Sequence, residues 1–140
     1  MTLVRIEIGQ SAIHGIGCFA KEPIKKGQMV WRFDEQFDRV LKKEFVNSLP
    51  AGAKENLLTY AYVSKTTGDY ILSSDDTKFT NHSNTPNISC FVPDGCTGNE
   101  LVCFANQDIA IGEEMTNDYR DFDVDPYDVE SVINGPVSLP

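Results

Sequence analysis

The sequence predicts a mostly β domain with short helices, and three observations lead to this fold class. The chain has 140 residues, which is enough for one compact domain with its own core. Its apolar residues fall in short runs rather than in long helical stretches. Ten glycines and seven prolines divide these runs, as expected for many short strands joined by tight turns.

Each predicted strand is a short apolar or alternating run, and each lies next to a turn-forming segment. The predicted strands are residues 3–8, 18–20, 29–33, 70–72, 88–92 and 101–105. The Gly- and Asp-rich loop 93–100 joins the last two as a pair. Helical apolar spacing predicts helices over 35–47 and 53–62, separated at Pro50 because proline removes a helix donor.

One five-residue pattern occurs twice with identical spacing. In each copy an isoleucine fixes a turn after a short strand, and a glycine relaxes the turn. The pattern therefore predicts that the same strand–turn–strand structure is used twice. The two copies are Phe19-Ala20, Ile24, Gly27 and Val30, and Phe104-Ala105, Ile109, Gly112 and Met115.

The formal net charge of −9 is concentrated near the C-terminus. Residues 1–99 are balanced, whereas residues 100–140 hold ten acidic side chains and one basic side chain, Arg120. A sequence-independent nucleic-acid binder or a polybasic membrane anchor needs a basic surface, so both classes are excluded. We expect no direct nucleic-acid or membrane partner.

The N-terminal residues lack the pattern of a signal peptide, and no apolar run approaches the ~20 residues that span a bilayer. The four cysteines form no Cys-x-x-Cys pair, so we expect reduced thiols, no metal site and a cytoplasmic protein. If the protein is a secreted effector, a host nucleus is an alternative location. The sequence does not predict the oligomeric state.

Three segments combine glycines, amides, a histidine and a tyrosine in ways that allow ligand binding. Considered singly, each has an ordinary explanation: a simple turn, a hydrogen-bonded structural histidine, and a core aromatic residue. The segments are His14-Gly15-Ile16-Gly17-Cys18-Phe19, Phe79-Thr80-Asn81-His82-Ser83-Asn84-Thr85-Pro86-Asn87 and Gly112-Glu113-Glu114-Met115-Thr116-Asn117-Asp118-Tyr119.

Taken together and in this order, the three segments resemble the SET-domain family of protein lysine methyltransferases. The resemblance implies a SET-domain fold of several small antiparallel sheets, with the last two motifs threaded as a C-terminal pseudoknot. We expect residues 1–122 to form this domain. We expect residues 123–140 to be a tail or lid that completes the active site.

The resemblance also implies a cofactor, S-adenosyl-L-methionine, and a substrate lysine that enters from the opposite face. Tyr119 matches the catalytic tyrosine. Tyr60, Tyr62 and Asn117 are the expected contacts of the substrate. The expected cofactor-binding residues are Gly15, Ile16, Gly17, Asn81, His82 and Phe122, with Tyr127 as another candidate for the closing aromatic.

Two departures from the family pattern are visible. No cysteine follows Cys103, so the zinc-binding segment that many members carry after the tyrosine is missing. Asn117 occupies a position that is often Phe or Tyr in the family. We expect the acidic side chains of the last segment to rim the substrate entrance and to stay out of the channel; they are Asp121, Asp123, Asp125, Asp128 and Glu130.

The resulting functional prediction is an S-adenosylmethionine-dependent protein lysine N-methyltransferase that acts on a basic, lysine-containing protein such as a histone. The alternative is a catalytically inactive module with the same fold that binds a basic peptide or a partner protein. A small-molecule N-methyltransferase is a third possibility, and the acidic segment disfavours it. The acidic segment itself has an alternative explanation as a solubilising surface.

Overall fold

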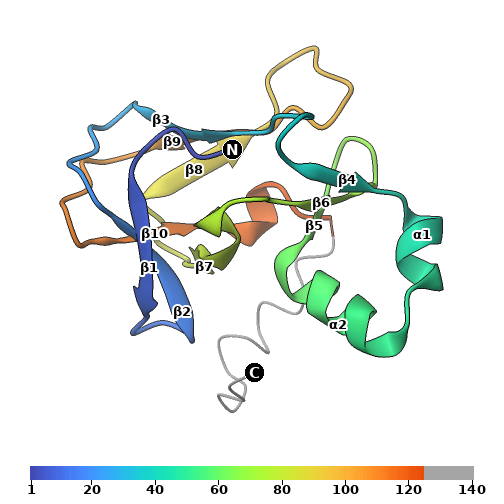
Figure 1. The fold of residues 1–140 in the computed structure, drawn as a ribbon. Coiled ribbons are helices and arrows are strands. Elements are labelled where there is room, and N and C mark those ends of the chain that lie inside the picture. The colour runs from blue at the N-terminus through green and yellow to red at the C-terminus, as the bar shows by residue number, and fades with distance from the viewer. Residues whose placement is uncertain (125–140) are drawn as a thin grey trace.

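The computed structural model describes residues 1–124, which form three small sheets and a few short helices (Figure 1). The first sheet has the order β1 (Ile6–Gln10), β2 (Ile16–Ala20), β10 (Glu114–Asn117), β7 (Asn81–His82). The second has the order β3 (Met29–Arg32), β9 (Val102–Ala105), β8 (Ile88–Phe91). The third has the order β4 (Arg39–Leu41), β6 (Tyr70–Leu72), β5 (Tyr62–Val63).

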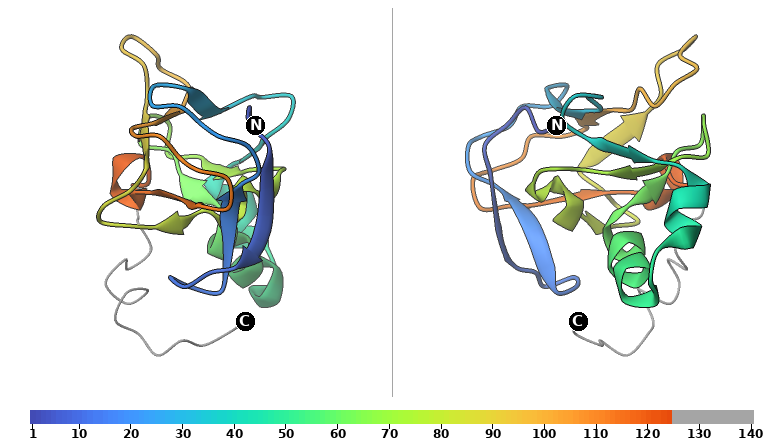
Figure 2. Two further views of the ribbon diagram at one scale, coloured as in Figure 1. Left: turned by 90° about the vertical axis from the view of Figure 1, so that its left-hand side faces the viewer. Right: turned by 45° about the vertical axis from the view of Figure 1, so that its right-hand side comes forward.

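The described residues form two short α-helices and two 3₁₀ helices. They are α1 (Lys43–Ser48), α2 (Ala51–Tyr60) and the 3₁₀ helices η1 (Asp76–Phe79) and η2 (Tyr119–Asp121). The β1–β2 hairpin and the pair α1–α2 lie on opposite sides of the molecule in Figure 1 and in the right-hand view of Figure 2. None of the helices in residues 1–124 has the length and apolar character required to span a membrane.

The predicted helix over 35–47 is wrong in its first half. Asp34 starts a turn instead, in which its carbonyl accepts from the N–H groups of Phe37 (3.0 Å) and Asp38 (2.7 Å). The buried Asp38 carboxylate then binds the N-terminal ammonium at 3.0 Å. The chain continues as β4, which pairs with β6. Tertiary partners that lie far away in sequence therefore override the local helical spacing.

The duplicated pattern forms a local two-fold arrangement. Ile24 and Ile109 exchange two backbone hydrogen bonds, of 3.0 and 2.8 Å, and each is 1% exposed. The bonds around them match in pairs, so the two turns have the same structure and pack against each other. The matched pairs are Ala20 N–H to Glu113 O (3.0 Å) with Ala105 N–H to Gln28 O (2.9 Å), and Gly27 N–H to Ala105 O (2.7 Å) with Gly112 N–H to Ala20 O (2.8 Å).

Strand β10 lies between β2 and β7 and forms the expected C-terminal crossing. It pairs antiparallel with β2 and parallel with β7, although the three strands are far apart in sequence. The buried Asn87 side chain anchors it: Oδ1 accepts from Thr116 N–H at 2.9 Å, and Nδ2 donates to Glu114 O at 2.8 Å. The amide thus acts as a hydrogen-bonding partner for β10 where no strand is available.

The main core packs the first two sheets together. Its members are Val4, Cys18, Ala20, Ile24, Val30, Trp31, Ile88, Cys90, Leu101, Cys103, Ala105, Ile109 and Met115. Within this core Cys90 and Cys103 form a disulfide, so the expectation of reduced thiols is wrong for this pair. The reason is the β8–β9 register, which places the two residues directly opposite each other. Cys18 and Cys96 are free.

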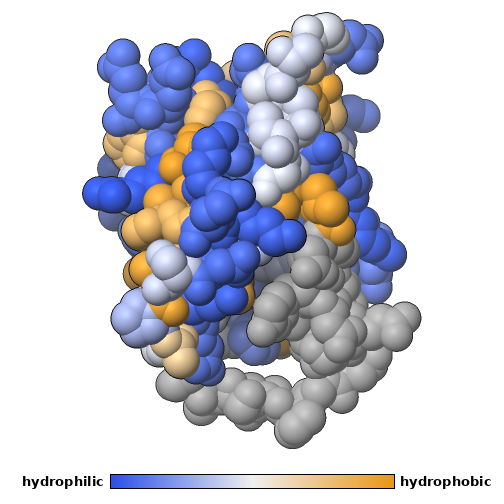
Figure 3. All heavy atoms as spheres, turned by 90° about the vertical axis from the view of Figure 1, so that its right-hand side faces the viewer, coloured by the Kyte–Doolittle hydropathy of each residue, from blue (hydrophilic) through white to orange (hydrophobic). Residues whose placement is uncertain are grey.

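The surface on the helical side is mixed in character. In Figure 3, which shows the side on which α1 and α2 lie in Figure 1, apolar side chains are interspersed among hydrophilic ones. Helix α2 contributes to this, because none of its residues is fully buried. One face of α2 borders the cavity that is described next.

Candidate active site

A cavity of about 140 Å³ is lined by residues from all three sheets and from α2. Its wall is mainly apolar and includes Trp31, Leu58 and Met115. The lining includes every residue expected to hold the substrate or to act on it, together with the expected closing aromatic. These residues are Tyr60, Tyr62, Asn117, Tyr119 and Phe122.

Tyr119 is fixed at the cavity wall at both its ends. Its hydroxyl donates to the Thr80 carbonyl at 2.7 Å, and its N–H donates to His82 Nδ1 at 3.2 Å. Burial raises the pKa of Tyr119 to about 12, and the nearby Asp123 charge acts in the same direction. The phenol is therefore neutral near pH 7 and is held in one orientation.

Two polar atoms of the cavity wall have no hydrogen-bond partner among residues 1–124: the Tyr62 hydroxyl and Asn117 Oδ1. Buried polar groups are usually paired, because burying them unpaired costs free energy. The Tyr62 ring is held edge-on to Phe122, with ring centroids 5.1 Å apart. Both atoms are thus placed to receive polar groups of a ligand that enters the cavity.

Asp123 departs from the expected acidic rim. It is only 9% exposed and lines the cavity, whereas Asp121 is exposed as predicted. Asp123 is drawn inward because its carboxylate accepts from Val63 N–H at 3.1 Å and its backbone bridges to Ser64. The prediction that the acids stay out of the channel is therefore wrong for Asp123. Asp125, Asp128, Glu130 and Tyr127 lie outside the described residues.

His82 is a buried, fully engaged histidine. Its Nδ1 accepts from Tyr119 N–H, so the other ring nitrogen, Nε2, carries the proton and faces Asn84 Oδ1 at 3.3 Å. Asp118 lies 3.6 Å from Nδ1. The side chain therefore positions the Tyr119 backbone, and only the His82 main chain is left to contact a cofactor. Residues 1–124 hold no cluster of three side chains suited to a metal.

The glycine-containing turn lies beside this cavity and does not line it. Gly15 has φ +46°, and the space where a side chain would begin is open. Ile16 is 48% exposed at the start of β2. Asn81 Nδ2 donates to the carbonyls of His14 (3.0 Å) and Ile16 (3.2 Å), which joins this turn to β7. Apart from Phe122, which lines the cavity, the predicted cofactor residues thus form a second group, connected to the first through β7 and β10.

Thr80, Asp123 and Glu114 make contacts in the cavity or at the glycine-containing turn that were not expected from the sequence. Thr80 precedes the Asn81-His82 pair and contributes only a carbonyl, so its residue type carries no information. Asp123 follows Tyr119 by four positions, through a short 3₁₀ helix without periodicity. Glu114 lies inside a quoted motif, but its contact with Ser11 depends on the pairing of β10 with β2, which the sequence does not show.

The structure has small sheets around a threaded C-terminal strand, a tyrosine-lined cavity and a separate glycine-containing turn. These features define a SET-type fold. The family model described as SET domain matches residues 15–120. The chain therefore belongs to the SET domain family.

Several named proteins are similar to the chain. Histone-lysine N-methyltransferase ATX2 of Arabidopsis thaliana is 29% identical over 133 residues, which cover 86% of this chain and 11% of that protein. An H3 lysine-4 specific histone-lysine N-methyltransferase of Schizosaccharomyces pombe is 27% identical over 120 residues, which cover 83% and 13%. The chain thus spans only about a tenth of the length of these relatives.

Solved structures confirm the fold. The Neurospora SET domain protein DIM-5, a histone lysine methyltransferase, matches with a TM-score of 0.59 at 24% identity, over 84% of this chain and 53% of that one. A chain of the Chaetomium thermophilum Polycomb Repressive Complex 2 matches with a TM-score of 0.62 at 19% identity, over 85% and 15%. The predicted mostly β SET-domain fold is therefore confirmed. The roles of individual site residues stay predictions.

Proposed function

We propose that this protein is an S-adenosylmethionine-dependent protein lysine N-methyltransferase that acts on a basic protein substrate. The observation that carries the proposal is the cavity, in which Tyr119 is fixed beside the unpartnered polar atoms of Tyr62 and Asn117. The names of the related histone-lysine methyltransferases support the same activity. They also favour a histone or a similar lysine-rich protein as the substrate.

The cavity suits a lysine side chain. Its apolar wall would pack against the methylene groups, and its unpartnered polar atoms would face the amine. The amine must be neutral to attack a methyl group. Removing its proton at pH 7 costs roughly 4.6 kcal/mol for an ordinary pKa of ~10.4. Apolar walls lower this cost, since burial disfavours the cation. The Tyr62 hydroxyl and Asn117 Oδ1 can orient the amine, so positioning supplies most of the catalysis.

The glycine-containing turn suits the cofactor. Open space at Gly15 and the exposed Ile16 leave room for an adenosyl group against backbone, and the Asn81 side chain binds the same turn. When bound, S-adenosylmethionine supplies a methyl group on a positively charged sulfur. Phe122, which packs against Tyr62 and Tyr119 in the cavity wall, is the expected closing aromatic.

A methyl-transfer assay tests the proposal. Purified protein is incubated with labelled S-adenosylmethionine and with histones or ribosomal proteins, and the modified residues are mapped by mass spectrometry. We expect labelled lysines. Tyr119→Phe should lower kcat by about 10- to 1,000-fold. Tyr70→Phe is the matched control and should leave kcat unchanged, because Tyr70 lies outside the cavity.

The outcomes separate the two candidate functions. Undiminished labelling by Tyr119→Phe would exclude the catalytic role of Tyr119. A protein that labels no substrate but binds basic peptides in calorimetry would instead be the inactive binding module.

A further inference from the structure

Glu114 is the residue at which three distant segments of the chain meet. Its Oε1 accepts from Ser11 Oγ at 2.8 Å and from Asn81 Nδ2 at 2.8 Å, and its Oε2 accepts from Ser11 Oγ at 2.9 Å. Ser11 begins the turn that leads to Gly15 and Gly17, while Asn81 belongs to β7. One carboxylate on β10 therefore holds both sides of the predicted cofactor site.

The Ser11 end of this contact organises the turn itself. The same Ser11 Oγ accepts from the N–H groups of Ile13 (2.9 Å) and His14 (3.2 Å). Ser11 N–H donates to the Gly15 carbonyl at 2.9 Å, which closes the turn. The Ser11 hydroxyl therefore donates its proton to the Glu114 carboxylate. Without Glu114, this hydroxyl would lose its acceptor.

Gly17 leaves the space that the carboxylate occupies. A side chain added at Gly17 would collide with Glu114 Oε1 and come within 2.8 Å of its Cδ. Gly17 is buried and has no positive φ to explain a glycine. The glycine at this position is thus explained by the carboxylate, and the two residues act as one unit.

No cation competes for this carboxylate in the described chain. Among residues 1–124, no lysine, arginine or histidine forms an ion pair with Glu114. Its partners are neutral donors, each of which belongs to the turn or to β7. A hydrogen bond to a charged group is stronger than one between neutral groups, so the contact is well suited to fixing a turn.

We propose that Glu114 is a positioning residue for the cofactor: its carboxylate fixes the Ser11–Gly17 turn against Asn81 and so forms the cofactor-binding surface before the cofactor arrives. This inference rests on the proposed function. It assigns Glu114 a role in cofactor affinity rather than in the chemical step, because the residue lies outside the lysine cavity.

Substitution at Glu114 tests the inference. Glu114→Ala removes the acceptor and should raise the KM and the Kd for S-adenosylmethionine by about 10-fold or more, with kcat changed less than threefold. Glu114→Gln keeps the shape and one acceptor oxygen, so it should recover most of the affinity. Glu113→Gln is the matched control, since the Glu113 carboxylate binds Ala110 N–H at 2.9 Å in the neighbouring turn.

A readout without activity comes from amide hydrogen exchange in the cofactor-free protein. Glu114→Ala should speed exchange at residues 13–17 and leave β8 and β9 unchanged. Gly17→Ala displaces the same carboxylate, so its effect on Kd and that of Glu114→Ala should be strongly non-additive in a double-mutant cycle. Gly17→Ala also tests the inference if Glu114→Ala fails to fold.

The results distinguish this inference from the proposed function. Wild-type protein that binds no S-adenosylmethionine in calorimetry would overturn both. Wild-type binding together with an unchanged Kd in Glu114→Ala would overturn only the role of Glu114. A lower melting temperature and a lower kcat at unchanged Kd would show that Glu114 is merely structural.

Discussion

Ile24 and Ile109 face each other across a local two-fold axis and exchange both of their backbone hydrogen bonds, at 3.0 and 2.8 Å. Each belongs to one copy of the duplicated sequence pattern, and each is 1% exposed. The pair joins the turn after β2 to the turn after β9, so it connects the sheet that carries the glycine-containing turn with the sheet that backs the cavity.

Truncation at this pair should destabilise the whole domain. Ile24→Ala and Ile109→Ala should each lower the free energy of unfolding by roughly 2–5 kcal/mol, because each leaves a cavity in a fully buried site. Their effects should be non-additive, since the residues are in contact. Urea unfolding measures both. Ile111→Ala is the control and should change stability by less than about 0.5 kcal/mol, because Ile111 is 64% exposed.

Alkaline pH should destabilise the protein through Tyr119. An unfolded phenol ionises near pH 10, whereas burial raises the pKa of Tyr119 to about 12 in the fold. The folded state thus holds this proton more tightly, and its contribution to stability is complete below about pH 10 and is lost as pH rises toward 12. Tyr119→Phe should flatten this decline in urea unfolding between pH 9 and 11.5. A decline as steep as that of wild type would contradict the assignment.

Asp123 should oppose deprotonation of the substrate amine. Its buried carboxylate lines the cavity, and a nearby negative charge favours the ammonium form. Asp123→Asn keeps an acceptor for Val63 N–H and removes the charge. We therefore expect the rising limb of the kcat/KM pH profile to move to lower pH by up to about one unit. An unchanged limb would indicate that the carboxylate lies too far from the amine to act on it.

The remaining acids of the C-terminal segment should steer a basic substrate. Replacing Asp121, Asp125 and Asp128 by Asn should raise KM for a basic peptide and weaken its dependence on ionic strength. The control removes three exposed charges elsewhere, with Glu7→Gln, Glu35→Gln and Asp94→Asn. Equal effects in both triple variants would mean that only net charge matters.

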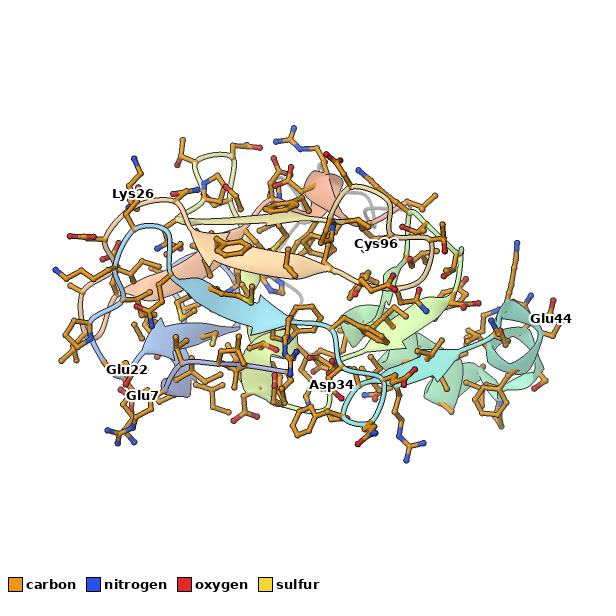
Figure 4. All side chains as sticks on the ribbon, turned by 90° about the horizontal axis from the view of Figure 1, so that it is seen from above. Glu7, Glu22, Lys26, Asp34, Glu44 and Cys96 are labelled. Atoms are coloured by element: carbon orange, nitrogen blue, oxygen red, sulfur yellow. A yellow bond between two sulfur atoms is a disulfide. The ribbon has the colours of Figure 1, made fainter. Side chains whose placement is uncertain are left out.

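The thiols should differ sharply in reactivity. Burial raises the pKa of Cys18 to about 12, so its thiol should stay unreactive in the native protein. Cys96 is partly exposed in the loop after β8 and should react quickly (Figure 4). A thiol-specific reagent should detect one fast thiol in the native protein, two after unfolding, and four after reduction of the Cys90–Cys103 disulfide. Four reactive thiols after unfolding without a reductant would argue against the disulfide.

The sequence predicts β1, β2 and the strands of the second sheet to within three residues, because their apolar runs are local, whereas β7 lies in a polar segment and is not predicted. The third sheet is harder: β4 and β5 are short and lie in segments with helical spacing, and their pairing with β6 depends on distant residues. The parallel pairing of β7 with β10 has no local pattern either. It is accessible only through the resemblance to a known family.

The disulfide could have been predicted. Aligning the ends of the expected strands 88–92 and 101–105 already places Cys90 opposite Cys103. The usual rarity of disulfides in cytoplasmic proteins argues in the opposite direction.

The candidate site, like the fold, could be predicted only in part from the sequence. Tyr119 and Asn117 line the cavity together because they belong to one motif at the end of β10, whereas Tyr62 was expected there only from its region of the chain. Asp123 could not be placed from the sequence, because its burial depends on a bridge to Ser64 that no periodic pattern encodes.

The threading of β10 has a consequence for how the chain folds. This strand can dock only after β2 and β7 have both taken their places, and its contacts with them close very long loops. Folding should accordingly be slow for a domain of this size, and β10 should be among the last segments to reach its native position. Tyr119 lies two residues after β10, so the chain brings the predicted catalytic tyrosine into place in the same final step that makes the fold complete.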